Sequence, residues 1–479
     1  MTSLADDTRW MDATDQAALV ASGKVSALEL VEAAIERIER IDPALNALTY
    51  RWFDDARRLA ASPSLPSGPF RGVPFLLKDL YAAEAGRPLS NGSKCYKEAG
   101  YVSPDDTTLV SRYKAAGLVT LGRTNSPELG SVPVTEPEAW GPTRNPWDVS
   151  RTSGGSSGGA AAAVASGMVP FAHASDGGGS IRIPAACCGL VGLKPSQGRI
   201  TLGPARDESN LGVEHCVSRT VRDTARLLDA THGPGVGDTV IAPAPARPYV
   251  DEIGADPGRL RIGFLDHSPR GFAVHQDCVT GVHATATLLE SLGHHVEAAW
   301  PEILADHSQG KAFGAMWSTN MGMALRRFAD ALGREITADD VESMNWVQAQ
   351  FAEKVSGVDY AAAQAASVSF RRAVQSWWAE GWDLLLTPTL SEPPLAIGTI
   401  RNDPERPMAP LARSGEWVTF TGQFNQSGQP AISLPLHRTA DGLPVGMQLV
   451  AAYGREDLLI QVASQLETAA PWAHLTPNI

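Results

Sequence analysis

Two glycine-rich segments, close together in the sequence, constrain this chain more than any other feature. The first reads Gly-Gly-Ser-Ser-Gly-Gly over 154–159, and the second reads Asp-Gly-Gly-Gly-Ser over 176–180. Glycine costs backbone entropy on folding, so a dense run of it belongs where the chain adopts positive φ or passes close to another group. A serine exposed on such a turn is a candidate nucleophile, which singles out Ser156 and Ser180.

An upstream lysine is the candidate base. Lys78 directly follows an apolar run over 73–77, so we expect it at the end of a buried strand. Burial disfavours the ammonium form and lowers a lysine pKa, by up to roughly 3–5 units when burial is complete. The neutral amine is then a general base. The three residues predict a relay in which Ser180 attacks a carbonyl carbon and Ser156 passes the proton to Lys78.

The second glycine segment also predicts an oxyanion hole. The backbone N–H groups of residues 177–180 are expected to face the oxygen that becomes negative in the tetrahedral intermediate. The four residues are Gly177, Gly178, Gly179 and Ser180. One such donor typically lowers the barrier by roughly 3–4 kcal/mol.

Other polar residues near these motifs are expected to support the loops. Asp176 and Arg182 are placed to pair across the Ser180 turn, and Ser157 to form a hydrogen bond near the oxyanion. A structural role is the simpler interpretation of the remaining neighbours. These are Asp79, Ser153, His173 and Lys194, the last interpreted as an exposed or loop-bracing cation.

Taken together, the motifs resemble the amidase signature family, and the resemblance covers most of the chain. It includes Lys78, the 154–159 loop, Gly-Gly-Ser-Ile-Arg-Ile-Pro over 178–184 and Cys-Gly-Leu-Val-Gly-Leu-Lys-Pro over 188–195. The resemblance implies that Ser180 is the nucleophile and that Ser156 is the bridging residue, preceded by a cis peptide bond. It also implies an acyl-enzyme and no metal or organic cofactor. The family more often has threonine where Gly177 stands.

The resemblance also bears on the substrate. Segments 135–147 and 451–457 are similar to family members that open cyclic amides of 6-aminohexanoate, so we expect a small neutral amide, a cyclic or linear oligomer. Carbamate (urethane) and aryl-acylamide hydrolysis are alternatives, and an amidotransferase-complex subunit is an alternative of another class. Trp317, Met321 and Asn425 are candidate pocket residues, although an aromatic and methionine-rich stripe is also typical of a helix core.

Two rival chemistries have less support. The loop over 154–158 also matches the Gly-x-Ser-x-Gly nucleophile elbow, in which Ser156 would attack. That fold needs a downstream histidine, and neither His437 nor His474 lies in a supporting motif. Neither glycine fingerprint of a nucleotide-binding loop occurs in the sequence.

Composition excludes several classes of partner. The net charge of −13 disfavours nucleic acids and anionic membranes, because affinity for either depends on Lys and Arg. No apolar stretch is long enough to span a membrane, and the N-terminus lacks a signal-peptide pattern, so we expect a cytoplasmic protein. The partner expected is a small-molecule amide, and the resemblance is compatible with a homodimer. Five cysteines without metal spacing indicate reduced thiols.

The chain as a whole, 479 residues long, reads as a single α/β domain with the amidase signature fold, a mixed β-sheet flanked by helices on both faces. A capping box at Ser26 and Glu29 predicts a helix over 26–42 that Pro43 ends, and a second helix is expected over 160–165. Apolar runs predict strands over 72–77, 118–122, 169–174, 189–193, 260–265, 384–388, 431–435 and 445–451.

We expect three sections within this domain. N-terminal helices occupy 1–65, and the catalytic core occupies 66–240 and 382–472. A proline-rich linker over 242–248 leads to a helical peripheral section over 250–380, which is expected to lie over the active site.

Overall fold

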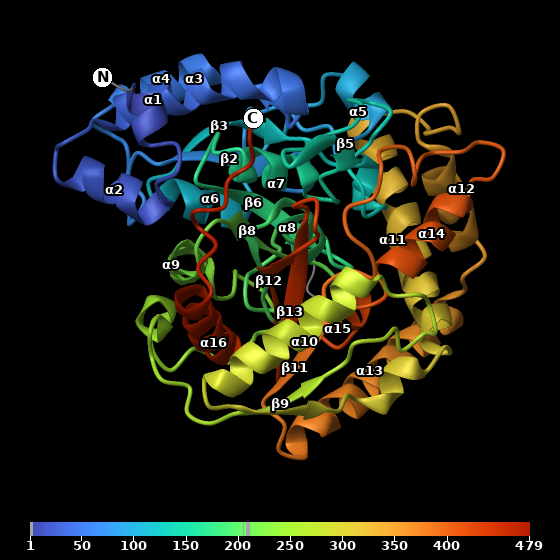
Figure 1. Ribbon diagram of the computed structural model, residues 1–479. Helices are drawn as coiled ribbons and strands as arrows, with labels where there is room; N and C mark the ends of the chain where they lie inside the picture. The colour runs from blue at the N-terminus through green and yellow to red at the C-terminus, as the bar shows by residue number, and fades with distance from the viewer. Residues whose placement is uncertain (1–2, 205, 207–210) are drawn as a thin grey trace.

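The computed structural model describes residues 3–204, 206 and 211–479. Among these residues, an eight-stranded mixed sheet forms the centre, with strand order β10-β9-β11-β13-β12-β7-β8-β6 (Figure 1). In that order the strands are His295–Ala298, Arg261–Phe264, Leu384–Pro388, Pro444–Ala451, Ala431–Arg438, Val191–Lys194, Val213–Ser218 and Phe171–Asp176. The first three run parallel, and the later pairs are antiparallel.

A small sheet lies against the β6 edge of the large one. It contains β1 (Leu48–Arg51), β3 (Val119–Thr124) and β2 (Pro74–Lys78), with β3 in the middle. Strand β2 packs beside β6, so the end of β2 comes close to the second glycine segment. A separate hairpin pairs β4 (Arg144–Asn145) with β5 (Asp148–Thr152).

Helices cover both faces of the large sheet, as predicted. On one face lie α7 (Gly158–Ala165) and α8 (Arg182–Cys188), packed with α3 (Ala27–Leu45) into one apolar cluster. On the other lie α9 (Val221–Thr231), α10 (Gln276–Ser291) and α16 (Glu456–Ala469). The alternation of side chains along a strand explains the division, because Phe171 belongs to the second cluster and Ala172 to the first.

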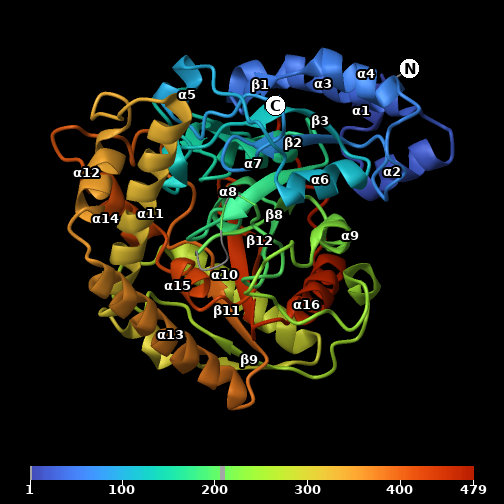
Figure 2. The same ribbon diagram turned by 180° about the vertical axis from the view of Figure 1, so that it is seen from behind.

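Two long helices and two short ones form a cover along one side of the molecule (Figures 1 and 2). They are α11 (Gln309–Leu332), α12 (Ser343–Ala352), α13 (Gly357–Ala379) and α14 (Ala409–Trp417). The section predicted as helical over 250–380 begins instead with sheet, because β9, α10 and β10 form a parallel unit that extends the main sheet. Parallel neighbours need a crossover connection, and α10 supplies it.

The remaining helices are short and lie mostly in the N-terminal third. They are α1 (Leu4–Asp7), α2 (Ala13–Ala21), α4 (Phe53–Ala61), α5 (Lys94–Glu98), α6 (Thr108–Ala115) and α15 (Gly422–Gln426), with 3-10 turns at Glu128–Gly130, Tyr249–Glu252 and Glu302–Ala305. Within the described part of the chain, no helix combines the length and apolar character needed to cross a bilayer.

The local predictions agree closely with the structure. Each predicted strand begins within two residues of its expected start. The capping box at Ser26 and Glu29 is present, but α3 continues past Pro43 to Leu45 and ends at Asn46 in the left-handed conformation. Pro43 therefore removes one backbone N–H donor from the last turn, but it does not end the helix. All five cysteines are buried and unpaired.

Candidate active site

Lys78 ends β2 and is completely buried. Its Nζ lies 2.6 Å from Ser156 Oγ and 2.9 Å from Ser175 Oγ. Burial holds the pKa of the Lys78 amine well below its ordinary value; the charge of Asp176 opposes this effect and that of Arg206 adds to it. The buried amine expected from the sequence is present, and its surroundings favour the uncharged form.

The two hydroxyl contacts suit a neutral amine. Such an amine has one lone pair and two N–H bonds, so it can accept a hydrogen bond from Ser156 while donating one to Ser175. Sequence reasoning missed Ser175. The signal was strand alternation, since residues 173 and 175 lie on the same face of β6 and both contact Lys78.

His173 fixes the backbone of Lys78. The Lys78 N–H donates to His173 Nδ1 at 3.2 Å, and His173 Nε2 lies 2.6 Å from a Glu214 carboxylate oxygen. Burial lowers the pKa of His173 well below its ordinary value. A neutral ring whose Nδ1 accepts carries its hydrogen on Nε2 and donates it to Glu214. This agrees with the structural role predicted for His173.

Ser156 stands on the turn that leads into α7. The peptide bond between Gly155 and Ser156 is cis, as the family resemblance implies. Thr135 braces this turn, because its Oγ1 donates to Gly154 O at 2.9 Å and accepts from Gly158 N at 3.1 Å. Ser156 and Ser180 line the same cavity.

A buried ion pair holds the loop that carries Ser180. Arg182 Nε lies 2.9 Å from Asp176 Oδ2, and neither side chain is exposed. Burial alone would raise the Asp176 pKa, but the charge and hydrogen bonds of Arg182 outweigh it and hold that pKa well below its usual range. The predicted pair across the turn is present.

The same carboxylate changes the predicted oxyanion hole. The Gly179 N–H donates to Asp176 Oδ1 at 2.7 Å, so this donor is already engaged. The N–H groups of Gly177, Gly178 and Ser180 have no acceptor within the described residues. Gly179 is therefore not available as an oxyanion donor, and three of the four expected donors remain.

Gly179 has a conformational role instead. Its φ is +135°, and a Cβ there would lie 2.5 Å from Thr421 Oγ1. Thr421 approaches this closely because its hydroxyl donates to Gly178 O at 2.6 Å. A larger residue at 179 would break that brace. At Gly177 the situation differs, since a Cβ would only contact Trp317, at an ordinary 3.8 Å.

Asn425 lies elsewhere than expected, whereas Ser157 has the supporting role that was predicted for it. Asn425, predicted in the pocket, sits behind the loop, where its Nδ2 donates to Asp176 Oδ1 at 2.8 Å and its Oδ1 accepts from Arg182 at 2.7 Å. Ser157, predicted near the oxyanion, donates to Ser175 O at 3.2 Å. Both residues support the site, because their side chains form hydrogen bonds with the backbone or with the ion pair.

Of the two alternatives for Lys194, an exposed cation is wrong, and a brace of the following loop agrees with the structure. The sequence indicated an exposed or loop-bracing cation, but Lys194 ends β7 completely buried, with Nζ donating to Pro195 O at 2.9 Å. Burial lowers its pKa to about 7, with the charge of Arg182 as the next cause. Asp79 and Ser153 are structural as predicted: Asp79 accepts from Ser90 N at 2.8 Å, and Ser153 Oγ donates to Thr143 O.

Two cavities meet at Ser180. The smaller has a volume of about 130 Å³ and includes Ser156 and Met321 in its wall. The larger, of about 480 Å³, lies under the helical cover. Trp317 borders both. No group of three His, Cys, Asp or Glu side chains in the described part of the chain is arranged to bind a metal ion.

Known proteins are similar to this chain in sequence and in fold. Residues 29–460 match the family described as Amidase. The 6-aminohexanoate-cyclic-dimer hydrolase of Paenarthrobacter ureafaciens is 45% identical over 480 residues, covering 98% of this chain and 97% of the relative. A solved 6-aminohexanoate cyclic dimer hydrolase superposes with a TM-score of 0.95 at 44% identity, covering 98% of this chain and 99% of that one. A bacterial aryl acylamidase does so with 0.87 at 29% identity, over 98% of both chains.

Proposed function

The chain belongs to the amidase family, and from this premise we propose that Ser180, Ser156 and Lys78 hydrolyse a small neutral amide through an acyl-enzyme. Membership makes the protein an amidase, an enzyme that hydrolyses carbon–nitrogen bonds other than peptide bonds. The observation that supports the mechanism most strongly is the 2.6 Å contact between the buried Lys78 amine and the Ser156 hydroxyl.

The first half of the reaction forms the acyl-enzyme. The neutral Lys78 amine accepts the Ser156 proton while Ser156 accepts the Ser180 proton, so that Ser180 Oγ bonds to the carbonyl carbon. The N–H groups of Gly177, Gly178 and Ser180 stabilise the oxyanion. When the carbon–nitrogen bond breaks, Ser156 donates a proton to the departing nitrogen and regains one from Lys78. The free amine leaves, and the acyl group stays on Ser180.

The second half releases the acid. A water molecule gives its proton through Ser156 to Lys78 as its oxygen bonds to the acyl carbon. The bond to Ser180 then breaks, the proton returns to Ser180 Oγ, and the carboxylic acid departs. No group outside the chain and the water is needed for the balance of protons.

For the substrate we favour cyclic and linear oligomers of 6-aminohexanoate. The support is the 45% identity and the TM-score of 0.95 to proteins named as hydrolases of the cyclic dimer. Aryl acylamides are a second candidate because of the similarity to an aryl acylamidase, and carbamates present a similar carbonyl. A role as an amidotransferase subunit predicts activity only in the presence of partner subunits.

A substrate panel tests the proposal. The purified chain alone is given the cyclic and linear dimers of 6-aminohexanoate, an aryl acylamide and a carbamate, and kcat/KM is measured for each. We expect the highest value for one of the two dimers. Activity on none of the amides, or only after partner subunits are added, would contradict it.

Covalent labelling tests the roles of the serines. An organophosphonate should label Ser180, and Ser180→Ala should abolish the label, as read by peptide mass spectrometry. Ser156→Ala should slow turnover while the label remains on Ser180. A label on Ser156 in the Ser180→Ala variant would reverse the two roles.

A further inference from the structure

Four glutamine side chains line the larger cavity beside Ser180, and three of them form hydrogen bonds with the protein. Gln309 Nε2 donates to an aspartate carboxylate at 3.0 Å, and Gln423 Nε2 donates to a backbone carbonyl at 2.7 Å. Gln426 Nε2 donates to the Gln309 side-chain oxygen at 3.4 Å. The fourth is Gln348 on α12, and its surroundings are different.

The side-chain amide of Gln348 is buried but unpaired. Only 1% of the residue is exposed, and Nε2 has no hydrogen-bond partner among the residues that the structure describes. No described group bonds to its Oε1 either. A side-chain amide offers N–H donors at one end and an acceptor oxygen at the other, and burying such a group without partners is unfavourable. The arrangement therefore indicates a partner that a ligand supplies.

Trp317 brings a second unpaired donor to the wall of this cavity. Its Nε1–H has no acceptor within the described part of the chain, and it lies on α11, the helix that packs against α12 (Figures 1 and 2). The ring is held by a stack on Phe313, with centroids 5.5 Å apart and planes at 18°. Ser180 and Gly178 line the same cavity. A molecule attacked by Ser180 therefore has access to a space whose cover contains two polar groups without partners.

We propose that Gln348 is a specificity-determining residue that forms hydrogen bonds with a second amide of the substrate. The substrate class that follows is a diamide, in which Ser180 attacks one amide and the other stays intact in the larger cavity. The cyclic dimer of 6-aminohexanoate belongs to this class, because its ring contains two amides. Its intact amide offers a carbonyl acceptor and an N–H donor, which complement the two ends of the Gln348 amide. The inference rests on the proposed function, since it takes Ser180 as the nucleophile.

The unpaired state of Gln348 makes this contact a source of selectivity. A ligand that fills the cavity without a second amide excludes water from the Gln348 side chain and gives it no partner, which is costly. A site built to form a hydrogen bond with a substrate therefore rejects an analogue that lacks the matching group. An added methylene, by contrast, changes affinity only modestly. We therefore expect the second amide to count for more than the length of the apolar chain.

Two lactams of the same ring size test the proposal on the wild-type enzyme. Tridecanelactam is the cyclic dimer of 6-aminohexanoate with its second amide replaced by two methylenes. We expect kcat/KM to be at least about 10-fold higher for the cyclic dimer. Equal values, a higher value for tridecanelactam, or hydrolysis of other amides but neither lactam would overturn the inference and leave the amidase function standing. Hydrolysis of no amide at all would overturn the function itself.

A substitution at Gln348 locates the effect. Gln348→Leu removes both ends of the amide at a similar side-chain volume, so it should lower kcat/KM for the cyclic dimer at least about 10-fold more than for tridecanelactam. The matched control is Gln350→Leu on the same helix, because Gln350 is exposed and lines neither cavity. This control should change the ratio of the two values by less than about 2-fold.

A purely structural role for Gln348 would give a different result. Asn345, one turn earlier on α12, donates to Glu128 Oε2 at 2.8 Å, but its Oδ1 is unpaired within the described residues. If Gln348 serves this oxygen instead, Gln348→Leu would lower the free energy of unfolding in urea and reduce kcat/KM equally for both lactams, which would contradict the proposal. Should Gln348→Leu fail to fold, Gln348→Met, unbranched and of similar length, gives the same comparison.

Discussion

Two buried lysines at the ends of two strands, Lys78 on β2 and Lys194 on β7, stand in contrasting environments. Neither has exposed surface, and burial is the first cause of a lowered pKa in both. Lys78 Nζ contacts two hydroxyls beside a cavity, whereas Lys194 Nζ donates to the carbonyl of the next residue. Burial thus favours a neutral amine in both places, and only the partners of that amine distinguish a base from a structural residue.

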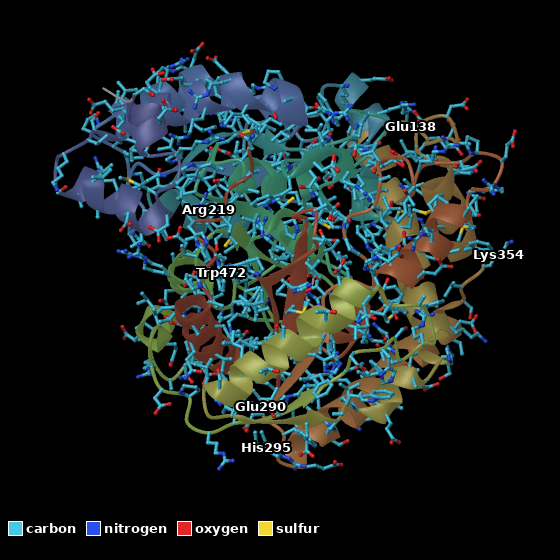
Figure 3. All side chains as sticks on the ribbon, in the orientation of Figure 1. Glu138, Arg219, Glu290, His295, Lys354 and Trp472 are labelled. Carbon is cyan, nitrogen blue, oxygen red and sulfur yellow. The ribbon has the colours of Figure 1, made fainter. Side chains whose placement is uncertain are left out.

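The largest expected difference between the two lysines is in turnover. Lys78→Met should lower kcat/KM roughly 10³- to 10⁴-fold, because the proton acceptor is lost. Lys194→Met should cost less than about 10-fold, since Lys194 touches neither serine. The comparison needs a third lysine as control, and Lys354, at the outer edge of the helical cover (Figure 3), serves this purpose. Equal losses for Lys78→Met and Lys194→Met would break the contrast.

Variants of Ser175 test whether its hydroxyl orients the Lys78 amine. Ser175→Ala removes the acceptor 2.9 Å from Lys78 Nζ and should lower kcat roughly 10- to 100-fold with little change in KM, because the amine loses its orientation. Ser175→Thr retains the hydroxyl and should restore most of the activity. If the alanine and threonine variants behave alike, the hydroxyl has no positioning role.

A smaller effect concerns stability, where the two lysines should resemble each other. For each, the pKa is lower in the folded than in the unfolded chain. Between the two pKa values the unfolded chain binds a proton that the folded chain does not, so the lysine costs stability, and the cost grows as pH falls from about 10.5. The free energy of unfolding of Lys78→Met and Lys194→Met should therefore exceed that of wild type. The difference should grow as pH falls through that window, by up to about 1.4 kcal/mol for each pH unit.

Urea unfolding between pH 7 and 10 measures this difference. The exposed Lys354→Met variant is again the control and should show no such trend. A difference between Lys78→Met and wild type that does not vary with pH would mean that Lys78 is charged in the folded protein.

The site residues and strands that depend on neighbouring residues could be predicted from the sequence. The contacts that depend on residues distant in the chain could not. Lys78, Ser156 and Ser180 follow from local motifs, and the strands follow from apolar runs. By contrast, the engagement of Gly179 depends on where the Asp176 side chain turns, and the place of Asn425 depends on a contact across 249 residues.

Lys194 shows the same limit for charged residues. Lys78 and Lys194 both follow apolar runs, so this pattern alone does not distinguish them. Lysine side chains are mostly exposed in proteins, and the packing of other segments around β7 buries Lys194. The helical section predicted over 250–380 was placed too early for a similar reason. Its first part joins the main sheet, because β9 pairs with β11, more than a hundred positions away. Patterns along the chain identify a strand, but they do not specify its neighbours.

The central claim, that a neutral Lys78 amine activates Ser180, is tested most directly by the pH dependence of covalent labelling. The second-order rate of labelling by an organophosphonate reports activation of the nucleophile in the free enzyme, without a leaving amine. We predict that this rate rises with pH through a pKa well below 10.5 in wild type and in Lys194→Met, and that the rise is absent in Lys78→Met. The same rising profile in Lys78→Met would contradict the account.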